Sequence, residues 1–93
     1  MKIAVRWIDE DRFIAGSYDH SASIWRLTTA DGTDRLSFVQ IKELLFTGTV
    51  EAIEILPRLH MLAISIRDDN YLHVVDTSTE SFSVCVCLLF FRK

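Results

Sequence analysis

Short apolar runs alternate with polar turns along the whole chain, and a new run begins roughly every 8–12 residues, a spacing typical of an antiparallel β meander. The turns are rich in Asp, Asn, Gly and Ser, which favour chain reversal. The pattern predicts eight strands in two groups of four, separated at residues 47–49. The expected strands cover residues 3–8, 12–17, 22–27, 36–46, 50–56, 60–66, 71–75 and 82–91.

The run from Leu36 to Phe46 fits two kinds of element. Its apolar residues, among them Phe38, Ile41 and Leu45, also follow the spacing of an amphipathic helix. The β-rich sequence on both sides favours a strand, and a helix remains open at this point.

The two halves of the chain resemble each other, which is the most informative feature of the sequence. Residues 12–19 compare with residues 60–65, and residues 19–26 compare with residues 69–76, about 50 positions further on. The second half carries extra residues in its turn, at Arg67 and Asp68. An internal repeat of roughly this length is expected for the blades of a β-propeller.

The first half carries the more specific signature. It reads as a strand, a charged turn, a strand ending in Ala15-Gly16-Ser17, then Asp19 and a strand ending in Ile24-Trp25. In this order the segment resembles a WD40 repeat. The resemblance covers residues 1–76 and implies an all-β fold of two four-stranded antiparallel meander blades of an incomplete WD40-like β-propeller. Residues 1–46 would form the first blade, and residues 47–93 the second, which ends in a divergent apolar strand.

The resemblance also implies a hydrogen-bonded structural network in each repeat, formed by a turn Asp, a Ser or Thr on the second strand and a Trp on the third. The matching residues are Ser17, Asp19 and Trp25 in the first repeat and Ser65, Asp69 and Asp76 in the second.

The chain departs from the WD40 pattern at three places. Arg26 replaces the Asp that usually follows the Trp, and Val75 stands where the second Trp would be. Thr49 follows Gly48 where the family has a Gly-His pair. Apart from the family pattern, Trp25 has a large apolar body and one donor, which suits a position between two sheets.

Composition and charge exclude several classes of function. A hydrophobic content of 49% argues against disorder, and a net charge of −3 leaves no basic footprint for nucleic acid or for a membrane surface. The longest apolar run, residues 84–91, is far shorter than the roughly 20 residues of a membrane helix. No export signal begins the chain, so an intracellular location, cytoplasmic or nuclear, is expected.

The residues that could carry chemistry do not form a catalytic pattern, and we expect no enzyme activity, no cofactor and no metal. The sequence has no glycine-rich phosphate loop and no nucleophile elbow. Cys85 and Cys87 can be considered as half of a metal site, as a redox pair or as small apolar filler on a strand, which is the favoured interpretation. His20, His60 and His73 are expected as turn or strand residues rather than as ligands or bases.

The expected function is a non-catalytic one: a scaffold fragment that binds protein partners through the loops at the rim of the propeller. The candidate contact loops are residues 9–11, 28–34, 57–59 and 67–70. Two blades alone leave open faces and strand edges, so self-association through the apolar residues 82–91 is also expected.

Two alternatives remain. Eight strands suffice for a small closed β-barrel that binds an apolar small molecule, and a truncated product without independent function is the other alternative. A blade predicts apolar runs buried on both faces, such as the run from Met61 to Ile66, whereas a barrel predicts strict alternation on every strand.

Overall fold

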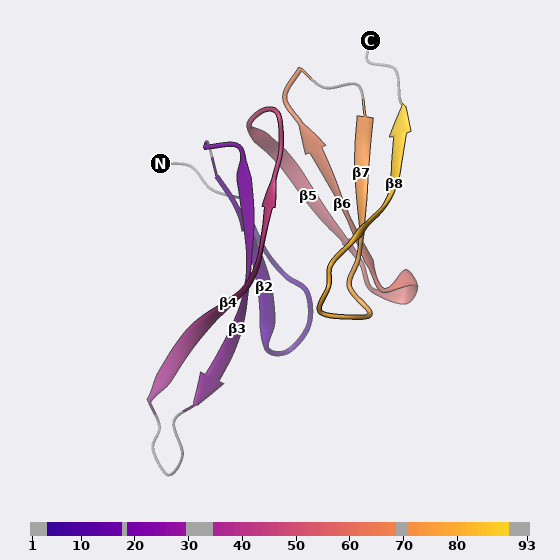
Figure 1. Ribbon diagram of the computed structural model, residues 1–93. Coiled ribbons are helices and arrows are strands. Elements are labelled where there is room, and N and C mark those ends of the chain that lie inside the picture. The colour runs from indigo at the N-terminus through magenta and orange to yellow at the C-terminus, as the bar shows by residue number, and fades with distance from the viewer. Residues whose placement is uncertain (1–3, 18, 30–34, 69–70, 90–93) are drawn as a thin grey trace.

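The computed structural model describes residues 4–17, 19–29, 35–68 and 71–89, and of residues 85–89 the backbone alone. In these ranges the chain is all-β apart from one short 3-10 turn, as the sequence predicts. The strands form two four-stranded antiparallel sheets, and in each sheet every strand pairs with the next one along the chain (Figure 1).

The first sheet contains β1 (Val5–Trp7), β2 (Arg12–Gly16), β3 (Ser21–Thr29) and β4 (Leu36–Leu45). The ambiguous run is therefore a strand, because its backbone pairs with β3 along nearly its whole length, from Ser21 opposite Leu45 to Thr29 opposite Leu36. A bulge opposite Ile24 and Trp25 adds one residue to β4. The β3–β4 hairpin extends away from the second sheet (Figure 1).

The second sheet contains β5 (Val50–Leu56), β6 (Met61–Ile66), β7 (Tyr71–Asp76) and β8 (Val84–Leu89), with the 3-10 turn η1 (Pro57–Leu59) between β5 and β6. Pro57 ends β5 because it has no backbone N–H for the ladder, and its fixed φ suits the first position of the turn. His60 then adopts a left-handed conformation with φ 54°, which reverses the chain into β6.

A single apolar core joins the inner faces of the two sheets. Gly16 lies at a close approach of β2 to β5, since a Cβ there would be 2.7 Å from Val50 Cγ1. The buried residues of this core are Ile14, Ala22, Ile24, Leu44, Val50, Ile53, Leu62, Ile64, Ile66, Val75 and Phe82.

Three expectations are wrong. Strands of one sheet do not pair with strands of the other in the described ranges, so the eight strands do not close into a barrel. The run from Met61 to Ile66 is fully buried on one face only, because Leu62, Ile64 and Ile66 are buried while the residues between them are half-buried. Trp25 does not lie between the sheets. It pairs with Phe13, whose neighbour Ile14 faces the core, so the indole lies on the outer face, the face of the first sheet that points away from the second.

Phe82 is also placed differently from expectation. It precedes β8, which starts at Val84, and lies in the β7–β8 loop with φ 46°. Its side chain is fully buried in the core, and the Arg12 guanidinium lies 5.4 Å from its ring centre. An apolar loop residue that directly precedes a strand cannot be distinguished from the strand by hydrophobic pattern alone. The sequence therefore predicts a strand that begins too early, at Phe82.

The connections lie at two opposite ends of the molecule, because every strand pairs antiparallel with the next (Figure 1). At the lower end in Figure 1 lie residues 8–11, 57–60 and 77–83. At the upper end lie residues 17, 19 and 20, residues 46–49, and the turn that begins at Arg67. The terms lower end and upper end refer to these sets.

Candidate functional site

The structure brings two residues of the first predicted network together at the upper end. The Asp19 backbone N–H donates to Ser17 Oγ at 3.3 Å, and Ser21 Oγ donates to Asp19 Oδ1 at 2.6 Å. The hydrogen bonds from Ser21 and Ser17 hold the pKa of Asp19 below its ordinary value. They close the β2–β3 turn, in which His20 has φ 72°. Trp25 takes no part in these bonds, because it lies four residues along β3 on the outer face.

The second predicted network is not assembled as one group. Ser65 is half-buried on β6, and Asp69 lies outside the described residues. Asp76 is at the lower end of β7, where its Oδ1 accepts hydrogen bonds from the Ser78 N–H at 2.8 Å and from Ser78 Oγ at 2.6 Å. These bonds lower the pKa of Asp76. Asp19 and Asp76 thus close turns at opposite ends of the molecule.

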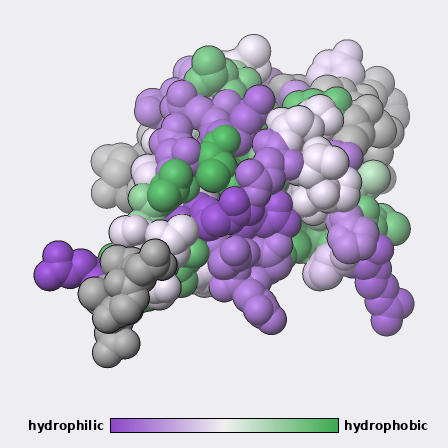
Figure 2. Space-filling model, turned by 60° about the horizontal axis from the view of Figure 1, so that its bottom comes forward, coloured by the Kyte–Doolittle hydropathy of each residue, from purple (hydrophilic) through white to green (hydrophobic). Residues whose placement is uncertain are grey.

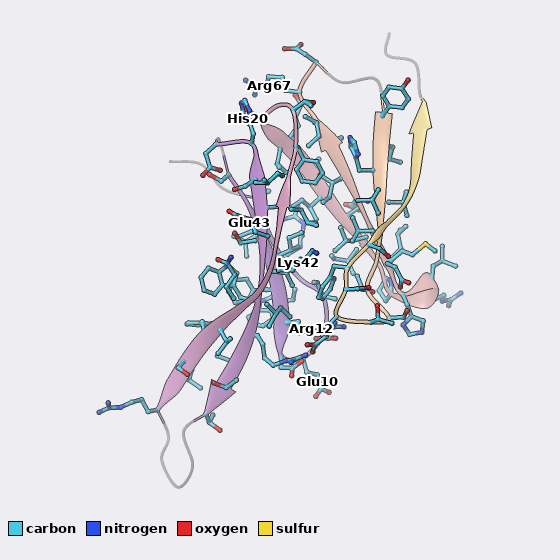
Figure 3. The ribbon with its side chains drawn as sticks, viewed as in Figure 1. Glu10, Arg12, His20, Lys42, Glu43 and Arg67 are labelled. Carbon is cyan, nitrogen blue, oxygen red and sulfur yellow. The ribbon has the colours of Figure 1, made fainter. Side chains whose placement is uncertain are left out.

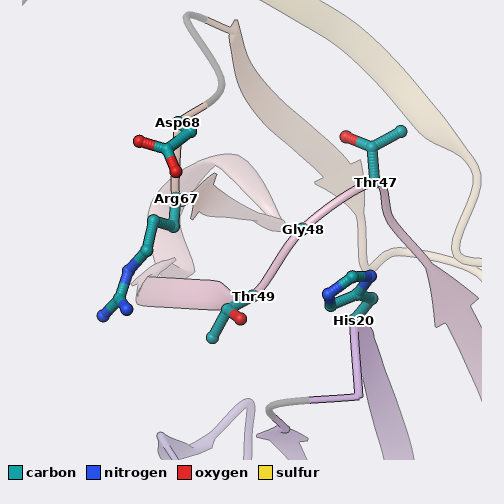
Figure 4. Close-up of a pocket in the computed structure, with 6 residues that line it drawn as sticks. All are labelled: His20, Thr47, Gly48, Thr49, Arg67 and Asp68. Carbon is teal, nitrogen blue, oxygen red and sulfur yellow. The ribbon is translucent and has the colours of Figure 1, made fainter.

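The upper end holds a polar pocket of about 300 Å³ between the two sheets (Figure 4). His20 and Arg67 lie on opposite sides of Gly48, and their side chains do not converge on one point (Figure 4). Arg67 Nε lies 3.7 Å from Glu51 Oε2, so its charge is already balanced within the second sheet. Gly48 fits closely here, because a Cβ would be 3.0 Å from the Arg67 carbonyl oxygen, a tight contact. The pocket is lined by His20, Thr47, Gly48, Thr49, Arg67 and Asp68.

The lower end holds a second pocket, of about 230 Å³, built around Arg12. The guanidinium donates from Nε and Nη2 to Asp9 Oδ2 at 2.9 and 2.6 Å, and from Nη2 to the Thr77 carbonyl at 3.2 Å. The Arg12 side chain is only 14% exposed, and it lowers the pKa of Asp9. Arg12 therefore links the first sheet to the β7–β8 loop. The pocket is lined by Ile8, Asp9, Arg12, Ile55, Pro57, His60 and Thr77.

A second arginine makes a parallel connection at the lower end. Arg26 Nη2 pairs with Glu80 of the β7–β8 loop, and Arg26 Nε lies 3.6 Å from Asp11 Oδ2. This Nε is buried and makes no hydrogen bond, so the Asp11 contact is a weak ionic one. The sequence marked Arg26 only as a departure from the repeat pattern. The sequence feature that could have indicated these ion pairs is an arginine on a predicted strand, together with a nearby acidic turn.

Next to the Arg12 pocket lies an apolar surface formed by η1. Leu56, Pro57, Arg58 and Leu59 line a shallow depression of about 580 Å³, and Leu59 is 62% exposed. Pro57 lines both this depression and the Arg12 pocket. Viewed with the lower end forward, hydrophobic side chains reach the surface among hydrophilic ones (Figure 2). Glu10 and Arg12 mark this end in the side-chain view (Figure 3).

The candidate contact loops do not form one surface. Residues 9–11 and 57–59 lie together at the lower end, whereas Arg67 and Asp68 lie at the upper end. Thr28 and Thr29 belong to β3, and residues 30–34 and 69–70 are outside the described ranges. Self-association through residues 82–91 cannot use Phe82, which is buried, and the side chains from Cys85 onward are not described.

The histidines take ordinary structural places. His60 accepts the Thr77 N–H at its carbonyl at 2.8 Å, and the His73 ring lies 5.3 Å from that of Phe46. In the described ranges no group of three or more His, Cys, Asp or Glu residues could hold a metal ion. Within the same ranges, no helix has the length and apolar character needed to cross a bilayer.

Comparison with known proteins adds no assignment: neither a family model, nor a curated protein, nor a solved structure matches this chain.

Proposed function

We propose that this chain is a non-catalytic protein-interaction module made of two WD40-like blades, and that it binds a protein partner through its lower end. The blade interpretation is supported by the succession of two four-stranded meanders of like topology, which pack on each other through their inner faces. It is supported further by the repeat in the sequence and by the aspartate-closed β2–β3 turn at Asp19.

The observation that carries the binding proposal is the juxtaposition of the apolar η1 surface and the Arg12 pocket. Protein interfaces combine an apolar centre with a polar rim. Leu56 and Leu59 supply exposed apolar area, and Asp9 and His60 line the adjoining pocket. A partner segment with one apolar anchor and neighbouring hydrogen-bond donors fits this arrangement.

Several contacts also hold the lower end together, which favours binding. Arg12 and Arg26 tie the first sheet to the β7–β8 loop, and η1 is fixed by Pro57 and by the hydrogen bond between Thr77 and His60. A surface that is ordered before binding loses less conformational entropy when the partner docks.

Site-specific photo-crosslinking in cells tests this proposal. A photoreactive amino acid at Arg58 reports on the lower end, and the same amino acid at Arg67 reports on the upper end as a matched control. We expect a defined protein to crosslink from position 58 and not from position 67. The charge-introducing change Leu59→Asp should abolish this crosslink, whereas Thr49→Asp at the upper end should leave it.

Binding of the captured partner in purified form gives the quantitative test. Loss of a central apolar anchor costs more than about 1 kcal/mol, so Leu59→Asp should weaken the affinity about fivefold or more by calorimetry. Equal crosslinking from both ends, or an unchanged affinity in Leu59→Asp, contradicts the proposal.

A further inference from the structure

The face of the first sheet that points away from the second sheet carries a continuous aromatic cluster. We call this the outer face. The register places Trp7 opposite Phe13, and Phe13 opposite Trp25, so the three side chains lie on one face. Phe38 lies opposite Leu27, two positions along β3 on that face. The rings of Trp7 and Phe13 have centres 5.2 Å apart, and those of Phe13 and Phe38 5.6 Å, both edge to face.

These side chains are exposed to an extent that is unusual for a monomer. Trp7 is 53% exposed, Phe38 55% and Leu36 58%. Val5 and Leu45 add exposed apolar area on the same face. Contiguous exposed apolar patches on proteins mark surfaces that become covered by a partner.

The outer face is also nearly free of charge. Among the residues of β1 to β4 that point to it, Glu43 is the charged one, opposite Ser23. It lies between Leu45 and the aromatic cluster, five residues along β4 from Phe38, or about 16 Å in an extended strand. Arg12 and Arg26 belong to the opposite face, where they contact the β7–β8 loop.

The size of the outer face suits a specific interface. β3 and β4 have nine and ten residues. β1 and β2 are shorter, with three and five residues, so at about 3.3 Å per residue and about 4.8 Å between strands the four strands cover about 430 Å² in projection. Large side chains raise the accessible area above this projected value, toward the roughly 800 Å² that each partner of a standard interface buries.

We propose that the outer face binds the outer face of a second copy of this chain, which gives a symmetric back-to-back dimer. With a two-fold axis that runs across the strands through the aromatic cluster, apolar surface meets apolar surface, and the two Glu43 carboxylates lie on opposite sides of the cluster. The outer face of the second sheet, taken from another copy, would be a poorer partner for this aromatic surface. Glu54 and Asp76 point to it, and an aromatic surface packed there would remove water from their charges.

The proposal is independent of partner binding at the lower end, because η1 and the Arg12 pocket stay uncovered in such a dimer. It also makes the two tryptophans direct reporters. The sequence has two Trp residues, and both lie on the outer face. Burial of Trp7 in the dimer removes water from its indole.

Sedimentation velocity and tryptophan fluorescence of the full chain, over a series of concentrations, test the dimer. We expect a single species with twice the 10.7 kDa chain mass at high concentration. On dilution the monomer should appear together with a red shift of the emission. The variant Trp25→Phe leaves Trp7 as the sole reporter and should show the same shift.

Substitutions on the outer face complete the test. Phe38→Lys and, separately, Trp7→Lys should give monomers with unchanged far-UV circular dichroism, because neither residue belongs to the core. Leu59→Lys, an equally exposed apolar site at the lower end, should remain dimeric. A wild-type chain that is monomeric at its highest soluble concentration overturns the proposal. So does a dimer that survives both outer-face changes, or one that forms without a change in the Trp7 emission.

Discussion

At the residue scale, Gly16 determines how closely the two sheets approach. A side chain at this position would meet Val50 Cγ1 at 2.7 Å and Ile53 Cδ1 at 3.5 Å. We expect Gly16→Val to lower the free energy of unfolding by about 1–3 kcal/mol, because overpacking forces neighbouring side chains or strands apart. Ala52→Val, which adds a valine at an exposed position of β5, is the matched control and should change stability little. Urea denaturation measures both, and equal stability of the two variants would show that the sheets have room to adjust.

Asp19 and Asp76 make the stability of the fold depend on pH. Hydrogen bonds from Ser21 and from Ser78 lower their pKa values below the ordinary 3.8. A carboxylate with a lowered folded pKa stabilises the folded chain above that ordinary value, and this stabilisation is lost as the pH falls through the lowered pKa. The free energy of unfolding should therefore fall below pH 3.8.

The double variant Asp19→Asn with Asp76→Asn should lose part of this acid dependence. Asparagine keeps an acceptor oxygen for the serine hydroxyls and does not titrate. Urea unfolding at a series of pH values gives the comparison with the wild-type chain. If both lose stability equally in acid, the dependence arises from other carboxylates, such as Asp9 beside Arg12.

At the scale of single elements, the sequence predicted most of the fold and little of the site. Alternation and turn residues located all eight strands, because a strand with one buried face leaves a period of two in the sequence. The same period does not determine which face of a strand packs against the other sheet. Trp25 was therefore assigned to the wrong side, and the clustering of Trp7, Phe13 and Phe38 depends on strand register, which the pattern leaves open.

The lower end was predicted only in part for a similar reason. Residues 9–11 and 57–59 were recognised as exposed loops from their polarity and from Pro57. Their proximity to each other, and the contacts of Arg12 with Thr77 and of Arg26 with Glu80, join positions more than forty residues apart. No local sequence pattern encodes such pairs.

The β7–β8 loop is the element whose role the sequence understated. Phe82 anchors it from within the core, fully buried and beneath the Arg12 guanidinium. We expect Phe82→Ala to cost about 3–5 kcal/mol, because it removes a buried aromatic side chain and leaves a cavity. Phe38→Ala, at an exposed aromatic residue, should cost clearly less when both are measured by thermal unfolding at a concentration where the chain is monomeric. A similar cost for both would mean that Phe82 is not part of the core.

At the scale of the whole molecule, one core spans two sheets that share no strand pairing in the described ranges. Each sheet alone would expose its inner face, so the two sheets should fold and unfold as one cooperative unit. The position of both tryptophans in the first sheet makes this testable, because tryptophan fluorescence follows the first sheet alone. Far-UV circular dichroism follows both sheets.

Ile64→Ala removes a buried side chain from the second sheet, and Ile24→Ala does the same in the first. Each should lower the free energy of unfolding by about 2–5 kcal/mol, the range for large-to-small changes in a core. For both variants, the urea midpoints from fluorescence and from circular dichroism should coincide at a fixed chain concentration. If Ile64→Ala shifts the circular dichroism transition and leaves the fluorescence transition at its wild-type position, the sheets are separate folding units. The packing of Gly16 against Val50 and Ile53 argues for the cooperative outcome, because it places side chains of the second sheet in direct contact with the backbone of the first.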